Sequence, residues 1–217
     1  MTPRYDAVIF DLDGTLLYTL PDLHSSLNAA LRECGYAERT LDETRRFIGN
    51  GSRKLIERAL PGEAENPDVD RVLAVYRRVY RENLVVGTVP YPGMESTLFA
   101  LRDAGLRLGV ATNKPHENAR YIIDTCFPGL FAAVEGNREG QPLKPDPAPV
   151  LRALRTLGVE ASRSLYAGDS DVDYYTAVNS GADSVLCAWG YRARPELEKL
   201  SPPAIIDSPG ELLNIIR

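Results

Sequence analysis

The chain has 217 residues, which is long enough for one or two domains with a sizeable buried core. Hydrophobic residues make up 44% of it and charged residues 25%, the balance of an ordinary globular protein. The net charge is -5 and basic residues do not gather in one stretch, so a nucleic-acid partner is not expected. No run approaches membrane-spanning length and the three cysteines share no metal-ligand spacing, so we expect a cytoplasmic protein with no membrane partner.

The first expected element is a strand at residues 7–10, a short β-branched and aromatic run typical of a buried strand. Residues 19–87 then show only helical patterns. Helix-start signals place helices after Thr19, over 41–47, after the cap Ser52 and after Asp68. Because helices alone interrupt an α/β pattern, we predict an inserted domain at 19–87 and a core formed by 1–18 and 88–217.

Strands and helices alternate in the rest of the chain. Strands are expected at 106–111, 131–134, 164–167, 184–188 and 204–206, with helices between them at 95–104, 117–126, before Gly158 and before Gly181. This alternation predicts a doubly wound, Rossmann-like parallel sheet of about six strands.

Two carboxylates, Asp11 and Asp13, follow the first strand, and Gly14 allows a sharp turn after them. Ligands of open α/β sheets lie at the carboxyl ends of the strands, where residues i and i+2 can face one crevice. Paired carboxylates attract a hard cation, for which Mg²⁺ is the first choice. One carboxylate could attack phosphorus and form an aspartyl-phosphate, while the other transfers protons.

Further polar groups follow the other predicted strand ends. Thr112 and Asn113 are placed to bind a phosphoryl oxygen, and Lys144 supplies a positive charge to the nucleophile and the phosphoryl group. Asp169 can complete a metal site. We therefore predict that the cation is held by Asp11, the backbone carbonyl of Asp13, Asp169 and water.

These motifs resemble those of the haloacid dehalogenase-like hydrolases, in particular the phosphoglycolate-phosphatase-like branch with a small helical cap. The resemblance is carried by residues 11–16, 111–114, 144–145 and 168–170 with Asp173 behind them. It implies a Rossmann-like core with a cap inserted after the first motif. It also implies that Asp11 is the nucleophile, that Asp13 is the general acid and base, and that Ser170 and Asp173 support the metal ligands.

The segment 48–54 is the candidate for substrate recognition within the inserted domain. A loop of Gly49, Asn50 and Gly51 precedes a helix that carries Arg53 and Lys54, so free amides, a positive helix end and two cations come together. The loop resembles the part of the cap that closes over the core in this branch. A small phosphorylated acid such as 2-phosphoglycolate would fit, with its phosphate in the core and its carboxylate at the cap.

The sequence therefore predicts Mg²⁺-dependent hydrolysis of a small phosphorylated metabolite through an aspartyl-phosphate, by a monomer or weak homodimer. A pyrophosphatase or a sugar-phosphate mutase could use the same core. A signalling switch that is phosphorylated on aspartate is the alternative outside enzymes. Receiver domains of that kind are shorter, lack an inserted cap, and accept phosphate at a later strand than their acidic pair.

Overall fold

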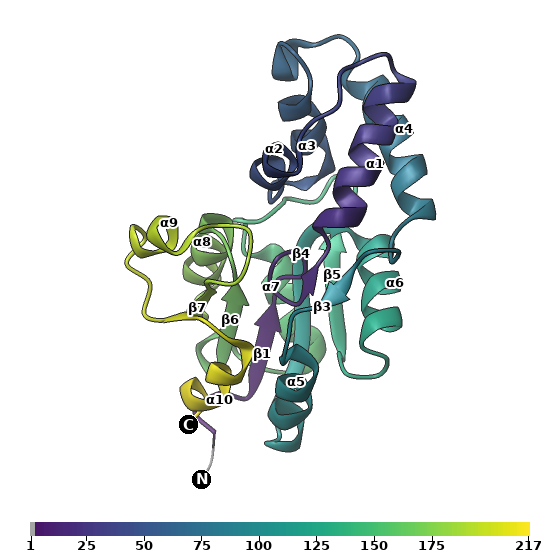
Figure 1. The fold of residues 1–217 in the computed structure, drawn as a ribbon. Coiled ribbons are helices and arrows are strands. Elements are labelled where there is room, and N and C mark those ends of the chain that lie inside the picture. The colour runs from purple at the N-terminus through teal and green to yellow at the C-terminus, as the bar shows by residue number, and fades with distance from the viewer. Residues whose placement is uncertain (1–2) are drawn as a thin grey trace. The chain divides into compact units, whose positions relative to one another are not determined.

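The computed structural model describes residues 3–217, which form two compact units (Figure 1). The chain up to Tyr18 and the segment Pro90–Arg217 form the first unit, and Thr19–Val89 form the second. The short strands β2 (Leu17–Tyr18) and β3 (Val89–Pro90) pair with each other where the chain passes between the units.

The first unit is built on a six-stranded sheet with the order β5-β4-β1-β6-β7-β8, in which every strand pairing is parallel. Ala7 at the start of β1 pairs with Arg107 of β4 on one side and with Ser164 of β6 on the other. The chain thus winds outward in both directions from β1, so the carboxyl end of β1 is the switch point of the sheet, where ligands bind in such folds. The strands are β1 (Ala7–Phe10), β4 (Arg107–Pro115), β5 (Ala133–Asn137), β6 (Ser164–Gly168), β7 (Asp183–Cys187) and β8 (Ile205–Ile206).

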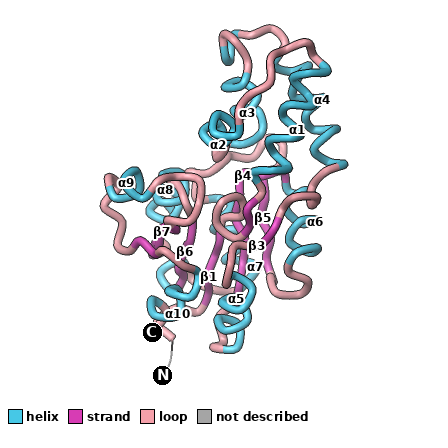
Figure 2. The backbone as a smooth tube through the Cα atoms, viewed as in Figure 1, coloured by secondary structure: helices cyan, strands magenta, loops and turns pink. Residues whose placement is uncertain are grey.

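Helices flank this sheet (Figure 2). All four residues of β1 are fully buried, which explains why this strand is apolar on both faces. Ile9 and Ala111 share a core cluster with Leu154 of α7 (Ala148–Leu157) and Tyr166 of β6. The helices are α5 (Met94–Asp103), α6 (His116–Cys126), α7 (Ala148–Leu157), α8 (Asp171–Ser180), α9 (Arg194–Glu198) and α10 (Leu212–Ile215). The predicted doubly wound α/β core is therefore confirmed.

The second unit is helical, apart from the β3 residue Val89 at its end. It consists of α1 (Leu20–Glu33), α2 (Leu41–Phe47), α3 (Gly51–Ala59) and α4 (Val69–Glu82), with a short 3-10 turn at Glu63–Glu65. The carboxylate of Asp22 in α1 accepts hydrogen bonds from the backbone N–H groups of Val86, Gly87 and Thr88 at 3.0, 2.7 and 2.9 Å. The start and the end of this unit are thereby tied together by its own residues.

The three largest differences from the expected element boundaries concern β4, β5 and α3. β4 continues through the polar residues 112–114 to Pro115, because Pro115 still pairs with Asn137 beyond an irregularity in the ladder. The next strand begins at Ala133 rather than at Phe131, whose ring packs against Phe10 with centroids 6.2 Å apart. Phe131 is therefore apolar because it packs in the core, and not because it belongs to a strand.

The third difference concerns α3, which begins at Gly51 with Asn50 as its cap and not after Ser52. Gly49 and Gly51 adopt φ angles of 118° and 82°, which favour glycine, and this lets the chain turn into the helix earlier.

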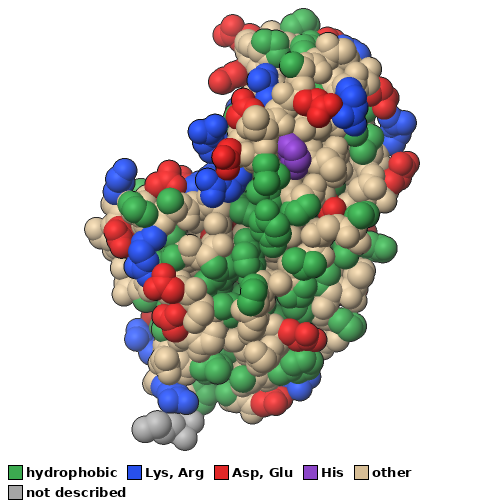
Figure 3. Space-filling model, in the orientation of Figure 1, with side chains coloured by type: hydrophobic (Ala, Val, Ile, Leu, Met, Phe, Trp, Pro, Cys, Tyr) green, Lys and Arg blue, Asp and Glu red, His purple; other side chains and the backbone are tan. Residues whose placement is uncertain are grey.

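Charged side chains of both signs are interspersed on the face of the molecule shown in Figure 3. Across residues 3–217, every helix is too short or too polar to cross a membrane.

Candidate active site

Asp11 lies at the carboxyl end of β1, at the switch point of the sheet. Its backbone N–H donates to the carbonyl of Ala167 at 2.9 Å, so the ladder with β6 continues up to the carboxylate-bearing residue. Gly14 then turns the chain at a φ of 88°. A Cβ at Gly14 would lie 2.5 Å from the Asp169 carboxylate, so glycine is required both by conformation and by space.

Lys144 is a buried positive charge in this site. Its ammonium forms ion pairs with Asp11 at 2.8 Å and Asp173 at 2.7 Å, and it donates a hydrogen bond to the Tyr166 hydroxyl at 2.8 Å. The Tyr166 hydroxyl in turn donates to the carbonyl of Ala111 at 2.9 Å. The side chain of Lys144 is only 2% exposed, so this position is fixed from three directions.

Asn113 of β4 holds the backbone of Lys144. Its side-chain oxygen accepts the backbone N–H of Lys144 at 2.8 Å, and its side-chain nitrogen donates to the Lys144 carbonyl at 3.2 Å. This reciprocal pair joins the end of β4 to the proline-containing loop that carries the lysine. The Asn113 amide therefore positions the lysine, a task that the sequence did not indicate.

Asp169 follows β6 and is held by two loops. The hydroxyl of Thr15 donates to one carboxylate oxygen at 3.1 Å, and the backbone N–H of Tyr191 donates to the other at 2.6 Å. Gly190 lies so close that a Cβ there would come within 2.2 Å of the Asp169 Cβ. The loop after β7 therefore fixes the carboxylate of Asp169.

Ser170 and Asp173 begin α8 as a capping box. One carboxylate oxygen of Asp173 accepts the backbone N–H groups of Asp169 and Ser170, at 3.1 and 3.0 Å, and the Ser170 hydroxyl at 2.6 Å. The other oxygen faces Lys144. Since both oxygens are engaged, Asp173 orients its neighbours and compensates the charge of the lysine.

Burial controls the electrostatics of these groups. It raises the pKa of Asp169, and the charges of Asp173 and Asp11 raise that pKa further. Burial also raises the pKa of Asp11, although the ammonium of Lys144 acts in the opposite direction. For Lys144, burial would lower the pKa, but Asp11 and Asp173 outweigh it and the pKa is raised well above its usual value. The lysine therefore stays charged.

The donor set fits a small divalent cation. Asp11, Asp169 and Asp173 each offer one carboxylate oxygen, and these atoms lie within 4.8 Å of one another. Hard oxygen donors of this kind are the ligands that Mg²⁺ prefers. The site holds the ammonium groups of Lys114 and Lys144. It also holds four carboxylates, which belong to Asp11, Asp13, Asp169 and Asp173. A dication would compensate the remaining negative charge.

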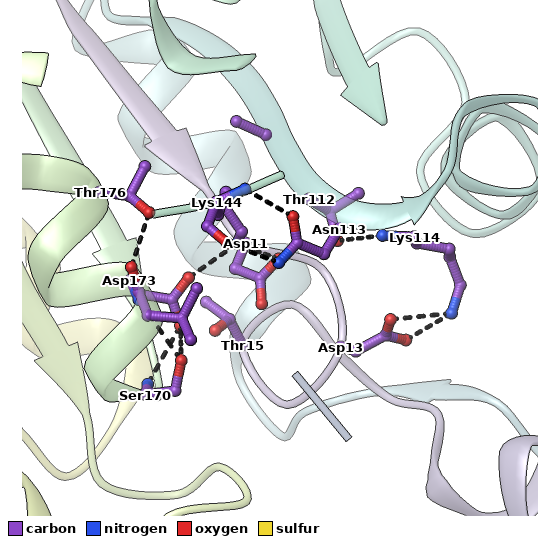
Figure 4. Close-up of polar contacts among 12 residues, drawn as sticks. Asp11, Asp13, Thr15, Thr112, Asn113, Lys114, Lys144, Ser170, Asp173 and Thr176 are labelled. Atoms are coloured by element: carbon purple, nitrogen blue, oxygen red, sulfur yellow. Dashed lines mark hydrogen bonds and ion pairs between the residues drawn. The ribbon is translucent and has the colours of Figure 1, made fainter. Parts of the chain in front are cut away.

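Lys114 and Asp13 form a second ion pair, which Figure 4 shows apart from the cluster of Asp11, Lys144 and Asp173. The ammonium of Lys114 contacts the two carboxylate oxygens of Asp13 at 2.7 and 2.8 Å. Thr112, two residues before this lysine, is buried, and its hydroxyl accepts the backbone N–H of Lys114 at 3.3 Å. The end of β4 thus brings Thr112, Asn113 and Lys114 to the same site as Asp11.

A family model described as haloacid dehalogenase-like hydrolase matches residues 8–187, which covers most of the chain and all of the residues gathered around Asp11 except Tyr191 and Gly190. The chain belongs to this family. Two proteins named phosphoglycolate phosphatase are similar to it over nearly their whole length. The protein from Aquifex aeolicus (strain VF5) is 34% identical over 96% of this chain and 95% of its own, and the protein from Cereibacter sphaeroides is 38% identical over 97% of both.

Solved structures agree with this assignment of the hydrolase fold. A crystal structure from Lactobacillus delbrueckii subsp. bulgaricus superposes with a TM-score of 0.92 at 33% identity and covers 98% of each chain. The sheet and the helical unit of this haloacid dehalogenase-like hydrolase therefore both have counterparts in a protein of known structure.

The predicted anion loop of the hydrolase lies in its helical unit. Gly49, Asn50 and Gly51 lead into α3, but the cations that follow already have acidic partners. Arg53 pairs with Asp70 at 2.6 Å, and Lys54 pairs with Glu57 at 2.6 Å. The side-chain oxygen of Asn50 accepts a hydrogen bond from Arg58 at 2.8 Å. Binding of a substrate anion by this loop stays a prediction.

Two groups of the hydrolase site had no assigned role in the sequence analysis. Tyr166 stands within an apolar strand, where nothing in the pattern distinguishes its hydroxyl from that of a core tyrosine. Lys114 stood in the second motif, but its pairing with Asp13 depends on the turn after β1, and no sequence spacing reports that contact.

Proposed function

We propose that this hydrolase is a Mg²⁺-dependent phosphatase that cleaves a small phosphomonoester, with 2-phosphoglycolate as its substrate. The observation that carries the proposal is the position of Asp11, a buried carboxylate between the ammonium of Lys144 and the carboxylate of Asp169. The names of the relatives from Aquifex aeolicus and Cereibacter sphaeroides support the choice of substrate.

In the first step, a carboxylate oxygen of Asp11 attacks phosphorus, and the bond from phosphorus to the leaving oxygen breaks. Asp13 gives its proton to that oxygen, so the alcohol leaves neutral and an aspartyl-phosphate remains on Asp11. In the second step, Asp13 takes a proton from water, and the water oxygen attacks the same phosphorus. Inorganic phosphate leaves, and the carboxylate of Asp11 is restored.

The remaining residues stabilise charge during both transfers. Lys144 and the hydroxyl of Thr112 stabilise the negative charge on the phosphoryl oxygens. Asn113 and Asp173 act through Lys144, whose backbone and ammonium they hold. Asp11, the backbone carbonyl of Asp13 and Asp169 are the proposed holders of Mg²⁺, which when bound neutralises phosphoryl charge.

We assign the helical unit Thr19–Val89 the role of a cap that limits the access of water to the phosphoryl group. The loop of Gly49, Asn50 and Gly51, with Arg53 and Lys54 behind it, is the sequence-based candidate for contact with the rest of the substrate.

The proposal is tested by phosphate release from 2-phosphoglycolate, other phosphomonoesters and pyrophosphate, with Mg²⁺ and with a chelator. The wild type is compared with Asp11→Asn, and Asp124→Asn, whose side chain is 63% exposed, is the matched control. We expect release that needs Mg²⁺, is lost in Asp11→Asn, persists in the control and is fastest with 2-phosphoglycolate. A stable acyl-phosphate without turnover would overturn the hydrolase proposal in favour of a phospho-acceptor switch.

A further inference from the structure

The ion pair between Lys114 and Asp13 is unusual because one of its members is the proposed proton donor. The Lys114 side chain is 2% exposed and that of Asp13 is 14% exposed. Both oxygens of Asp13 lie within 2.8 Å of the same ammonium. Asp13 therefore has no carboxylate oxygen outside the reach of Lys114 in this structure.

Catalysis requires this arrangement to change. A general acid must bring an oxygen within hydrogen-bond reach of the leaving oxygen, at about 2.6–3.2 Å. To act as the acid, Asp13 takes up a proton from water and turns toward the substrate, so Lys114 loses its negatively charged bidentate partner. Separating a buried ammonium from its carboxylate partner is strongly unfavourable, so a new anion at Lys114 would make the movement easier.

We propose that Lys114 binds an anionic group carried by the leaving group of the substrate, and accepts it in exchange for Asp13. This inference rests on the proposed function, because it takes Asp13 as the group that protonates the leaving oxygen. The substrate class that fits is a phosphomonoester whose ester carbon carries a carboxylate. In 2-phosphoglycolate the carboxylate is bonded to the CH₂ group that holds the ester oxygen, which places it beside Asp13 and thus beside Lys114.

Each of the other cations considered for this task keeps a carboxylate partner that takes no part in proton transfer to the leaving oxygen. Lys144 holds Asp11, Asp173 and Tyr166. Arg53 and Lys54 in the helical unit both contact Glu57, at 3.3 and 2.6 Å. Lys114 differs from them because its carboxylate partner must leave it to reach the leaving oxygen. Lys114 thus favours substrates whose leaving group carries an anion that replaces the carboxylate of Asp13.

The test compares two substrates that differ only at the group in place of the carboxylate. 2-Phosphoglycolate and ethyl phosphate carry the same phosphoryl group, and a methyl group replaces the carboxylate in the second. The ratio of their kcat/KM values is measured for the wild type and for Lys114→Met, with Lys199→Met at an exposed position as the matched control. A charged hydrogen bond to the carboxylate predicts that the ratio falls about 10- to 100-fold in Lys114→Met and stays unchanged in the control.

A binding measurement gives a second readout that needs no turnover. Calorimetry compares 3-phosphonopropionate, the carbon isostere of 2-phosphoglycolate, with propylphosphonate, which lacks the carboxylate. We expect the wild type to bind the carboxylate compound more tightly, Lys114→Met to lose that difference, and Lys114→Arg to recover part of it. Circular dichroism establishes whether each variant is folded, and Lys114→Arg carries the comparison if Lys114→Met is not.

Two results would overturn the inference. If Lys114→Met slows both substrates equally and binds the two phosphonates as the wild type does, Lys114 only holds Asp13. If Lys54→Met or Arg53→Met abolishes the preference instead, the helical unit recognises the carboxylate. If the proposed function is wrong, the wild type hydrolyses neither ester. The phosphonate binding comparison still decides the role of Lys114 in that case.

Discussion

Trp189 donates its indole N–H to the carbonyl oxygen of Thr15 at 3.0 Å, and the hydroxyl of Thr15 donates to Asp169 at 3.1 Å. The ring of Trp189 also lies 6.3 Å from that of Tyr91, centroid to centroid. The turn after β1 and the loop after β7 are thus joined at the back of the proposed metal site. A change at Asp169 therefore reaches the indole through a single residue.

We predict that Mg²⁺ changes the fluorescence of this indole. Trp189 is the only tryptophan in the chain, so the emission comes from this position alone. A titration of Mg²⁺ should give a saturable change in emission, and Asp169→Asn should lose it. Thr15→Val removes the hydroxyl that orients Asp169 and should weaken the apparent affinity by about 10- to 100-fold. A wild-type emission that is independent of Mg²⁺ would contradict this coupling.

The close approach of Gly190 to Asp169 gives a steric prediction. In Gly190→Ala the new methyl group would overlap Asp169 at 2.2 Å, so the loop after β7 must shift. We expect a loss of about 1–3 kcal/mol in the free energy of unfolding, together with weaker Mg²⁺ binding. Gly210→Ala is the control, because a Cβ there meets no atom within 4 Å and should change stability by less than about 0.5 kcal/mol. Urea unfolding measures both.

Replacement of Lys144 tests its role as the counter-charge of the site. Lys144→Met leaves Asp11 and Asp173 buried together without a cation. Removing one member of a buried ion pair typically costs about 3–5 kcal/mol. We expect a loss of this order in metal-free urea unfolding, and a fall in kcat of at least about 100-fold where the variant is folded. Lys144→Arg keeps the charge and should lose less stability, and equal losses in the two variants would argue for packing instead.

The pH dependence of stability follows from the buried carboxyl groups. In the absence of a metal ion, burial is the largest cause that raises the pKa of Asp169 from 3.8 to about 8 and that of Asp11 from 3.8 to about 6. The folded protein therefore keeps protons between pH 4 and 8 that the unfolded chain has lost. Since the folded state binds more protons there, the free energy of unfolding of the metal-free protein should fall as pH rises across this window.

Urea unfolding in a chelator between pH 5 and 8 measures this slope. Addition of Mg²⁺ should restore stability most at the upper end of the range, because the cation binds the deprotonated carboxylates. Asp169→Asn cannot titrate at this position and should flatten the slope. A metal-free stability that rises with pH across the window would contradict the assignment.

Local patterns were enough to predict the architecture of the core. The run at 7–10 and the alternation after residue 93 predicted the six-stranded parallel sheet, because fully buried strands are apolar on both faces. Strand limits were less certain. Phe131 was assigned to a strand because it is apolar, whereas it packs against Phe10 and Phe127 before the strand begins. The polar residues 112–114 belong to β4 because Pro115 beyond them still pairs with Asn137 of β5, which no local signal encodes.

The sequence also predicted that these polar side chains meet at one end of the sheet, since residues that follow parallel strands lie together there. It could not show which of them contact each other. Asn113 was expected to bind a phosphoryl oxygen, yet its amide holds the backbone of Lys144 from 31 positions earlier in the chain. Such contacts depend on how two loops meet in space, so they follow from the tertiary structure alone.

The clamp formed by Asp22 limits how the helical unit can vary. Because its carboxylate binds three successive backbone N–H groups at the far end of the insertion, the distance between the two ends is set inside the insertion itself. Changes in α2 and α3 can therefore accumulate without altering the two points at which the chain leaves and rejoins the sheet. This separation lets the proposed substrate-contacting loop vary while the spacing of the residues around Asp11 stays constant.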